Sequence, residues 1–388
     1  MSNVDQSFPA VVEPLARIPR SAYLLTACIA VIGSNSLVLG PIAPEVARSF
    51  GTSVPLVMAA ASAFGLGTAA SALFLARYID RFGVRSMLQW ALGLLALALA
   101  GSALAPTIPV LIVAQLVAGI AAGIALPAIY ASAAAIAPPG RESGTIGVVL
   151  TGWTLSMVAG VSLSAVIADL IHWRAVFAIV ATLALAAVAG VAAVSLSDRP
   201  SGSVAPAPLE ALRTPGIVPL LIACGAFMTA FYGVYGYLGD HLHEALGRPV
   251  SASGLAAVSY GIGFGAAALL DGIVDRLGAR RVMPIAYLAA GGVYLLLAAV
   301  SGSFGGLIAS MALWGLINHF GLNVLVTRLS ALDPARRGTI MGLNSAVTYL
   351  AVFVGTTAFG PLYQAMGFAA SALVAVALML VAAAAARH

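Results

Sequence analysis

Long apolar runs constrain this chain more than any other feature of its sequence. Runs of 20 residues or more recur along the 388 residues, and 61% of the residues are hydrophobic while only 8% are charged. A helix of about 20 apolar residues spans the roughly 30 Å of hydrocarbon in a bilayer. Spanning β-strands are about 10 residues long and alternate apolar with polar residues, which these runs do not. The sequence therefore predicts an all-α membrane protein.

The runs predict twelve transmembrane helices in two six-helix halves. Residues 1–20 are polar and are expected to form a cytosolic N-terminal tail. Residues 197–215, rich in Pro and Ser, are expected to form a cytosolic linker between an N-terminal half, 21–196, and a C-terminal half, 216–388. The predicted spans are 21–43, 54–76, 86–106, 108–136, 143–168, 174–196, 216–239, 251–273, 282–301, 304–327, 338–362 and 366–386.

The arginines orient the predicted helices. All 18 basic residues are Arg, and if the N-terminus is cytosolic, 15 of them fall on the cytosolic side and three on the other, namely Arg48, Arg174 and Arg248. Because cytosolic loops carry an excess of basic residues, both termini are expected in the cytosol of a multi-pass protein of a bacterial inner membrane. The net charge of +5 follows this topology and is no nucleic-acid signal. The absence of Lys excludes a Walker A loop and a Schiff base.

The two halves repeat one another at a nearly constant offset. "DRFGVR" at Asp80 matches "DRLGAR" at Asp275, 195 residues later, and "GTI" at Gly144 matches "GTI" at Gly338, 194 residues later. "AC" recurs at an offset of 196, and "GLG" and "GIG" fall in corresponding spans. Matches in register over a whole chain indicate duplication. The halves are therefore expected to be parallel repeats that are pseudo-symmetric about the membrane normal.

With these motifs the chain resembles the major facilitator superfamily over its whole length, and within it the twelve-span, proton-coupled branch that exports drugs and sugars. The family's loop signature, Gly-x-x-x-Asp-Arg-x-Gly-Arg-Arg, corresponds to "ARYIDRFGVR". "GPIAPEVARSFG" after the first span and "HWRAVF" before the sixth resemble two further family patterns. Gln115 stands where the family has a fourth-span Arg, and "GVSLSA" at Gly160 lacks the Pro of the fifth-span antiporter motif. Both departures weaken the case for a proton antiporter.

The repeated motif, "DRFGVR" at Asp80 and "DRLGAR" at Asp275, which we call the repeated phrase, is interpreted as a gate between the halves. A carboxylate where the second or eighth span ends can face the N-terminus of a helix in the other half, whose free N–H groups favour an anion. The resemblance makes span eleven, near Gly338, the partner of Asp80. Gly83 is expected to allow a tight turn, and Arg85 to pair with an acid. Topology alone is the other interpretation of this phrase. The predicted gating residues are Asp80, Arg81, Gly83, Arg85, Asp275, Arg276, Gly278 and Arg281.

Few titratable residues fall inside the predicted spans. His319 lies in the tenth span, which lines the cavity in the family, and a His can take up and release a proton near neutral pH. It is the first candidate for proton coupling, and Asp271 is the second. The other interpretations are that His319 bonds a neighbouring helix and that Asp271 belongs only to the gate.

Amides and aromatic residues predict a neutral substrate cavity. Met228, Tyr232 and Tyr235 are spaced to share one face of the seventh span, which suits a pocket wall. Helix–helix packing is the alternative for each residue taken singly. The predicted cavity residues are Asn35, Gln115, Trp153, Met228, Tyr232, Tyr235, Trp314, Asn318 and Asn323.

The sequence as a whole predicts a secondary active transporter and not an enzyme. We expect a small organic molecule as substrate, a proton as coupling ion, a monomer in the lipid bilayer, and no cofactor, metal or nucleic acid. Proton-coupled export is the leading mode. The alternative is an importer or an uncoupled facilitator of a small neutral or anionic solute, and a membrane sensor is the outside possibility.

Overall fold

The computed structural model describes residues 18–138, 142–194, 208–270, 272–333 and 336–387. Within this part of the chain all regular structure is helical, as predicted. The first half contains α1 (Arg20–Phe50), α2 (Val54–Phe74), η1 (Ala76–Tyr78), α3 (Ile79–Phe82), α4 (Val84–Ala103), α5 (Ile108–Ile136), α6 (Glu142–Leu155), η2 (Ser156–Val161), α7 (Ser162–Leu170) and α8 (Trp173–Ala193).

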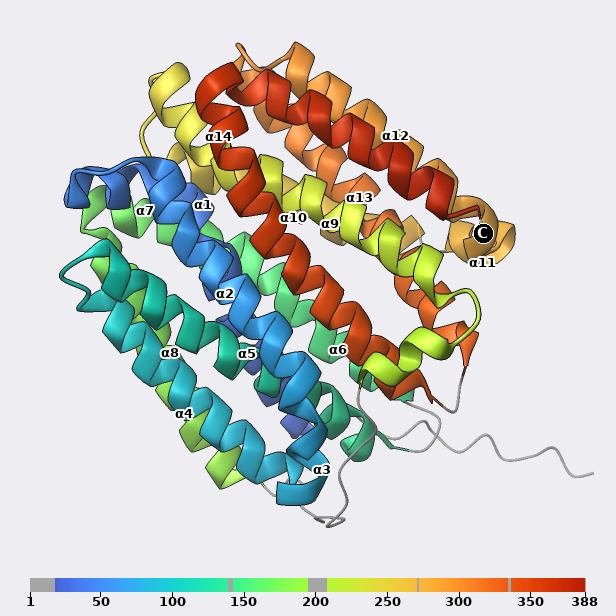
Figure 1. Ribbon diagram of the computed structural model, residues 1–388. Helices are drawn as coiled ribbons and strands as arrows, with labels where there is room; N and C mark the ends of the chain where they lie inside the picture. Colours follow the sequence, from blue (N-terminus) through green and yellow to red (C-terminus); the bar gives the residue numbers. More distant parts are fainter. Residues whose placement is uncertain (1–17, 139–141, 195–207, 271, 334–335, 388) are drawn as a thin grey trace, which may run out of the picture.

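The second half contains η3 (Pro208–Arg213), α9 (Ile217–Asp240), η4 (His241–Ala245), α10 (Ala252–Ala267), η5 (Ala268–Leu270), α11 (Gly272–Leu277), α12 (Ala279–Ala299), α13 (Phe304–Leu332) and α14 (Arg337–Ala385). In Figure 1 the blue-to-green helices of the first half form one bundle, and the yellow-to-red helices of the second half form another beside it.

Eleven helices in the described residues are long and apolar enough to cross a bilayer. The longest, α14, has 49 residues and bends at Gly367, where φ is 78° and ψ is −175°. Only Gly adopts this backbone conformation readily, so Gly367 marks the junction of two predicted spans within α14. The twelve-span prediction is therefore confirmed. The junction lies a few residues beyond the predicted end of span eleven, because the helix continues past residue 362 without a break.

The duplication predicted from the sequence is visible in the backbone. Gly83, between α3 and α4, has φ 88° and ψ 139°, and Gly278, between α11 and α12, has φ 82° and ψ 134°. A side chain would be strained at such positive φ values, so Gly is needed at each turn. The two copies of the phrase thus make the same turn, as expected for Gly83.

The bundle has two ends. We call the end that holds Gly83, Gly278 and Ala386 the linker side, and the end that holds Gly51, His172 and Gly247 the far side. On the linker side, α3 packs on η1 and α4, and α11 packs on η5 and α12, so each turn is supported by its own half. A Cβ added at Gly338, near the start of α14, would meet no described residue within 4 Å.

The halves pack closely between mid-bundle and the far side. The principal contacts pair α2 with α14, α1 with α9, and α10 with α7 and η2. A Cβ on Gly239 would lie 2.6 Å from the carbonyl oxygen of Gly40 and 3.0 Å from Cα of Pro41. Glycines thus let α1 and α9 approach almost backbone to backbone. The structure is a state in which the far side is closed.

The Gly239→Ala substitution tests this approach. The new methyl group would collide with backbone atoms of α1, which cannot move aside as a flexible side chain can, and such overpacking costs about 1–3 kcal/mol. We expect a lower melting temperature in detergent. Gly292→Ala is the matched control, because a Cβ there meets nothing within 4 Å and Ala favours a helix over Gly. Equal melting temperatures for the two variants would contradict the close approach.

Candidate functional site

A small cavity lies between the halves, bounded by α1, α2, α9 and α14. Its volume is about 10 Å³, and its lining includes Ser36, Met58, Tyr232, Tyr235 and Thr356. The hydroxyls of Ser36 and Tyr235 are buried without a hydrogen-bond partner among the described residues. A cavity of this size with such groups suits one water molecule. A drug-sized organic molecule needs several hundred Å³, so this cavity is too small to hold one in this state.

Tyrosines from three helices lie close to one another beside this cavity. The phenol groups of Tyr232, from α9, and Tyr349, from α14, lie beside the Ser36 hydroxyl without good hydrogen-bond geometry. Tyr130 of α5 lies near Tyr349 and accepts a 3.2 Å hydrogen bond from the indole N–H of Trp153 in α6. Tyr232 and Trp153 are half-buried. These groups offer donors, acceptors and flat apolar faces without a formal charge.

Hydroxyl groups join the halves next to the cavity. Ser62 of α2 lies 2.6 Å from the Thr356 hydroxyl of α14 and accepts a 2.9 Å bond from Thr357. Within the second half, Thr356 also accepts a 2.5 Å bond at its carbonyl oxygen from the phenol of Tyr237 in α9. Such bonds between apolar helices are worth on average about 0.6 kcal/mol each in a membrane, weak enough to break when the halves move.

Asn35 and Gln115 form a buried amide pair inside the first half. Asn35 Nδ2 donates to Gln115 Oε1 at 3.1 Å, and Gln115 Nε2 donates to Asn35 Oδ1 at 3.3 Å and to the Ser102 hydroxyl at 3.0 Å. Gln115 is fully buried, and Asn35 is 3% exposed. Both were predicted to line the substrate cavity, but in this state their amides bind each other across α1, α4 and α5. An uncharged network of Asn35, Gln115 and Ser102 thus lies where the family has a charged Arg in its fourth span.

Trp314 and Asn318 also lie inside a half rather than at the cavity. Trp314 is fully buried among Phe231, Tyr235, Tyr260 and Tyr294, with ring centroids 5.4–6.4 Å apart. Asn318 donates a 3.1 Å hydrogen bond to the Tyr260 hydroxyl. Trp314 and Asn318 are therefore buried inside the second half, because aromatic residues of α9, α10 and α12 cover this face of α13. Met228 is buried too, outside the cavity lining.

Another face of α13 is half-buried and polar. His319 packs edge-on against Phe264 of α10 with ring centroids 5.0 Å apart, and one turn nearer the linker side Asn323 accepts a 3.3 Å bond from Thr327. His319 and Asn323 are spaced i and i+4 and therefore lie one above the other. His319 lies at the middle of α13 and Asn323 lies one turn nearer the linker side, and neither lines the small cavity.

The predicted gating residues are only partly described. The side chains of Asp80 and Asp275 and the whole of Asp271 lie outside the described residues. Arg81, Arg276 and Arg281 are exposed. Arg85 was expected to pair with an acid, but in the described part of the chain it donates a 2.6 Å bond to the carbonyl oxygen of Ala192 at the end of α8. The free carbonyls and negative dipole end of that helix attract the guanidinium.

Several site residues were missed by sequence reasoning. Tyr130 and Tyr349 could have been found from the sequence, since polar aromatic residues inside apolar spans are candidates for hydrogen bonds between helices. Ser36, Ser62 and Thr356 could not, because Ser and Thr are common in such spans and can bond their own helix, as Thr356 does to the Val352 carbonyl. Only the packing of α2 against α14 shows that Ser62 and Thr356 face one another, and only the packing of α1 against α9 brings Ser36 to the cavity.

Comparison with known proteins is consistent with this geometry. Residues 24–355 match the family model of the Major Facilitator Superfamily, so the chain belongs to this superfamily of membrane transporters. It is 28% identical over 372 residues to the uncharacterized MFS-type transporter YwfA of Bacillus subtilis, covering 92% of this chain and 89% of that protein. It is 28% identical over 284 residues to a chloramphenicol resistance protein of Streptomyces lividans, covering 72% of this chain and 71% of that one.

A solved structure shows the same fold. The human organic anion transporter MFSD10 (TETRAN) superposes with a TM-score of 0.68 over 94% of this chain and 98% of its own, at 16% sequence identity. The fold and class expected from the sequence, a twelve-helix transporter of this superfamily and not an enzyme, are therefore confirmed.

A double-mutant cycle tests the amide pair. Asn35→Leu or Gln115→Met alone leaves a buried amide unsatisfied, which costs about 1–3 kcal/mol. The double variant removes both partners, so we expect it to cost clearly less than the sum of the two. Unfolding free energies in mixed micelles measure the coupling. Strictly additive losses would show that the two amides do not interact.

Proposed function

We propose that this protein is a secondary active transporter that moves a small, uncharged or weakly anionic organic molecule by alternating access, with export in exchange for protons as the leading mode. The observation that carries the proposal is the neutral lining of the cavity between the halves. Ser36, Tyr232, Tyr235 and Thr356 come from helices of both halves, so a molecule bound there would contact both. Rocking of the halves would then expose the site to either side in turn.

The lining favours neutral substrates over strongly cationic ones. The residues around the small cavity are apolar or carry hydroxyl groups, and none of them is a carboxylate. A cation deep in a membrane protein needs a compensating negative charge, which this lining does not supply. The similarity to a chloramphenicol resistance protein agrees with an uncharged, amphipathic substrate and with efflux.

The arginines favour a cytosolic linker side. Fifteen of the 18 fall on that side in the predicted topology, which is the bias of cytosolic loops. With this orientation in a bacterial inner membrane, the far-side-closed state faces inward. Residues 21–196 and 216–388 would act as two rigid units in a single chain joined by the linker at 197–215, and one copy of the chain holds the complete cavity.

The repeated phrase would close the linker side when the far side opens. Asp80 lies in the short helix α3, and the first turn of α14, like that of any helix, has N–H groups without a partner inside the helix. A Cβ at Gly338 would meet nothing within 4 Å in this state, which leaves space near that turn. A carboxylate docked there would be stabilised by those groups and by the helix dipole. Asp275 occupies the corresponding place in the second half and would face α6 in the same way.

His319 is the proposed proton carrier among the described residues. It is half-buried in α13 next to Phe264, and histidine changes charge within the range of cellular pH. An importer or facilitator is the second candidate function. The neutral Asn35–Gln115 pair favours it, because the Arg associated with proton coupling in the family is replaced by an amide.

Chloramphenicol flux into proteoliposomes tests the proposal. For proton exchange, an acidic interior should drive accumulation of the labelled compound severalfold above that in liposomes without protein, and a protonophore should abolish it. A symporter would instead accumulate it when the exterior is acidic, and a facilitator would equilibrate it at the same rate under both gradients. No protein-dependent flux of chloramphenicol or of other neutral amphiphiles, with flux of a lipophilic dication, would overturn the substrate class.

Two variants in the same assay test the residues. His319→Gln should keep exchange of labelled for unlabelled substrate while losing the dependence on the pH gradient. Asp80→Asn should lower both kinds of flux at unchanged protein level, because the linker side would close less well. Wild-type coupling in His319→Gln would remove His319 from the mechanism, and unchanged kinetics in Asp80→Asn would remove the gate.

A further inference from the structure

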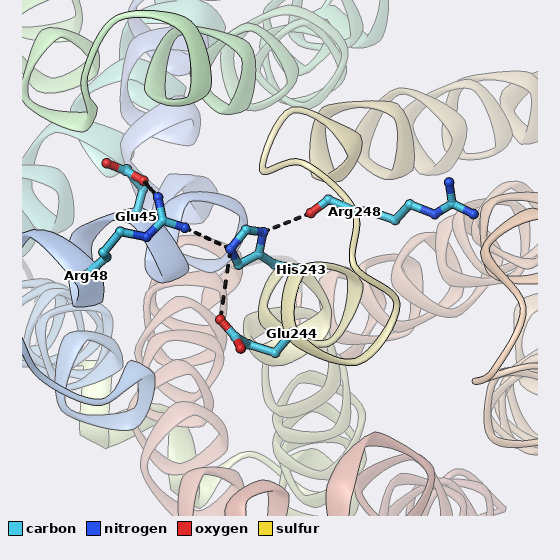
Figure 2. Close-up of polar contacts among 5 residues, drawn as sticks. All are labelled: Glu45, Arg48, His243, Glu244 and Arg248. Atoms are coloured by element: carbon cyan, nitrogen blue, oxygen red, sulfur yellow. Dashed lines mark hydrogen bonds and ion pairs between the residues drawn. The ribbon is translucent and has the colours of Figure 1, made fainter.

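The far side carries a polar contact between the halves that the transport site does not use. Arg48, in the last turn of α1, and His243, in η4 after α9, lie 2.8 Å apart between Nη2 and Nε2 (Figure 2). The other ring nitrogen of His243, Nδ1, lies 2.8 Å from the backbone carbonyl oxygen of Arg248. Arg48 Nη1 bonds Glu45 Oε2 at 2.6 Å, which orients the guanidinium towards the second half.

These two bonds fix the protonation state of the ring. A carbonyl oxygen only accepts, so Nδ1 of His243 must carry a proton. A guanidinium only donates, so Nε2 must be bare and must accept. The contact between the halves therefore requires the neutral Nδ1–H form of His243.

A second proton on the ring turns Nε2 from a hydrogen-bond acceptor into a donor. The protonated nitrogen can no longer accept from Arg48, and two positive charges would face one another. Glu244 offers a carboxylate oxygen 3.9 Å from the same nitrogen and can receive the new N–H. Three other ionisable groups lie near this point, namely Asp240, His241 and Tyr363. The negative charge of Asp240 would attract a protonated His243. His241 bonds the Ser301 carbonyl oxygen, and the Arg248 side chain stacks on Phe304.

We propose that His243 is a proton-binding site on the far side of the protein, and that protonation moves its Nε2 bond from Arg48 to Glu244 and so releases the contact between α1 and η4. The His243 side chain is 23% exposed, and Glu244 is 70% exposed, so protons from the far-side solution reach the site directly. The site is separate from His319, which lies within α13.

The effect on the far side is modest and measurable. A solvent-exposed charged contact is worth up to about 1 kcal/mol, which corresponds to about a fivefold change in the ratio of closed to open far side. Acidification of the far side would thus favour opening there. In the proposed orientation, that is the direction an exchanger driven by inward proton flow needs.

Distance measurements by pulsed electron resonance in nanodiscs test this site without any substrate. Spin labels at Ser53→Cys and Gly302→Cys report on the far side, because both positions are exposed and lie in different halves, while the native Cys28 and Cys224 are buried. When the pH falls from 8 to 5.5, we expect the population with the longer distance to rise about fivefold relative to the population with the shorter distance. In His243→Gln, whose amide oxygen still accepts from Arg48 but does not titrate, the shorter distance should persist at both pH values.

Further variants separate the site from general effects of pH. Arg48→Ala should raise the population with the longer distance already at pH 8 and should remove its dependence on pH. His172→Asn is the matched control: His172 also lies on the far side, but it caps α8 within its own half by accepting a bond from the Arg174 N–H, so the response should be retained. A full pH response in His243→Gln, or none in the parent protein, overturns the proposal. The inference rests on alternating access as proposed above, yet the readout involves no flux, so failure to find a substrate would leave it standing.

Discussion

The close packing of the two halves between mid-bundle and the far side is the contact on which the rest of the structure depends. Gly40 and Gly239 bring α1 and α9 almost into backbone contact, and Ser62 and Thr356 bond α2 to α14. Lipid offers no hydrophobic drive for helices to associate, so close packing and polar bonds supply the attraction. Small residues and single hydroxyl bonds make a contact that is specific and yet weak enough to open.

Neutral polar chemistry follows from the same constraint. Groups buried in a membrane must be satisfied, and charges there are costly. The chain meets this with amides and hydroxyls: Asn35 and Gln115 satisfy one another, and Trp153 bonds Tyr130. The hydroxyls of Ser36 and Tyr235, two of the buried polar groups that have no partner among the described residues, line the cavity between the halves. A buried donor without a partner gains free energy from a bound molecule that offers one, which is the reason for proposing Ser36 and Tyr235 as contacts of the substrate.

The sequence predicted the span count, the repeat and the fold class, because each is set by local hydropathy or by short motifs such as "DRFGVR" and "DRLGAR" that recur in register. It also named Tyr232 and Tyr235, which line the small cavity between the halves. It did not predict that Gln115 and Trp314 turn into the packed interior, since a helix face is assigned only when its neighbours are known. The Arg48–His243 contact joins positions 195 residues apart, which is the offset of the repeat, but an offset does not say which repeated positions meet in space.

Paired distance measurements across both ends of the bundle test the central claim most directly. Labels at Ser53→Cys and Gly302→Cys follow the far side, and labels at the exposed Phe82 and Leu277 positions follow the linker side. Gly239→Ala should push the halves apart on the far side, and two rigid halves rocking about the central cavity must then approach on the linker side. The account predicts a longer far-side and a shorter linker-side distance than in Gly292→Ala. A longer far-side distance with an unchanged or longer linker-side distance would contradict it.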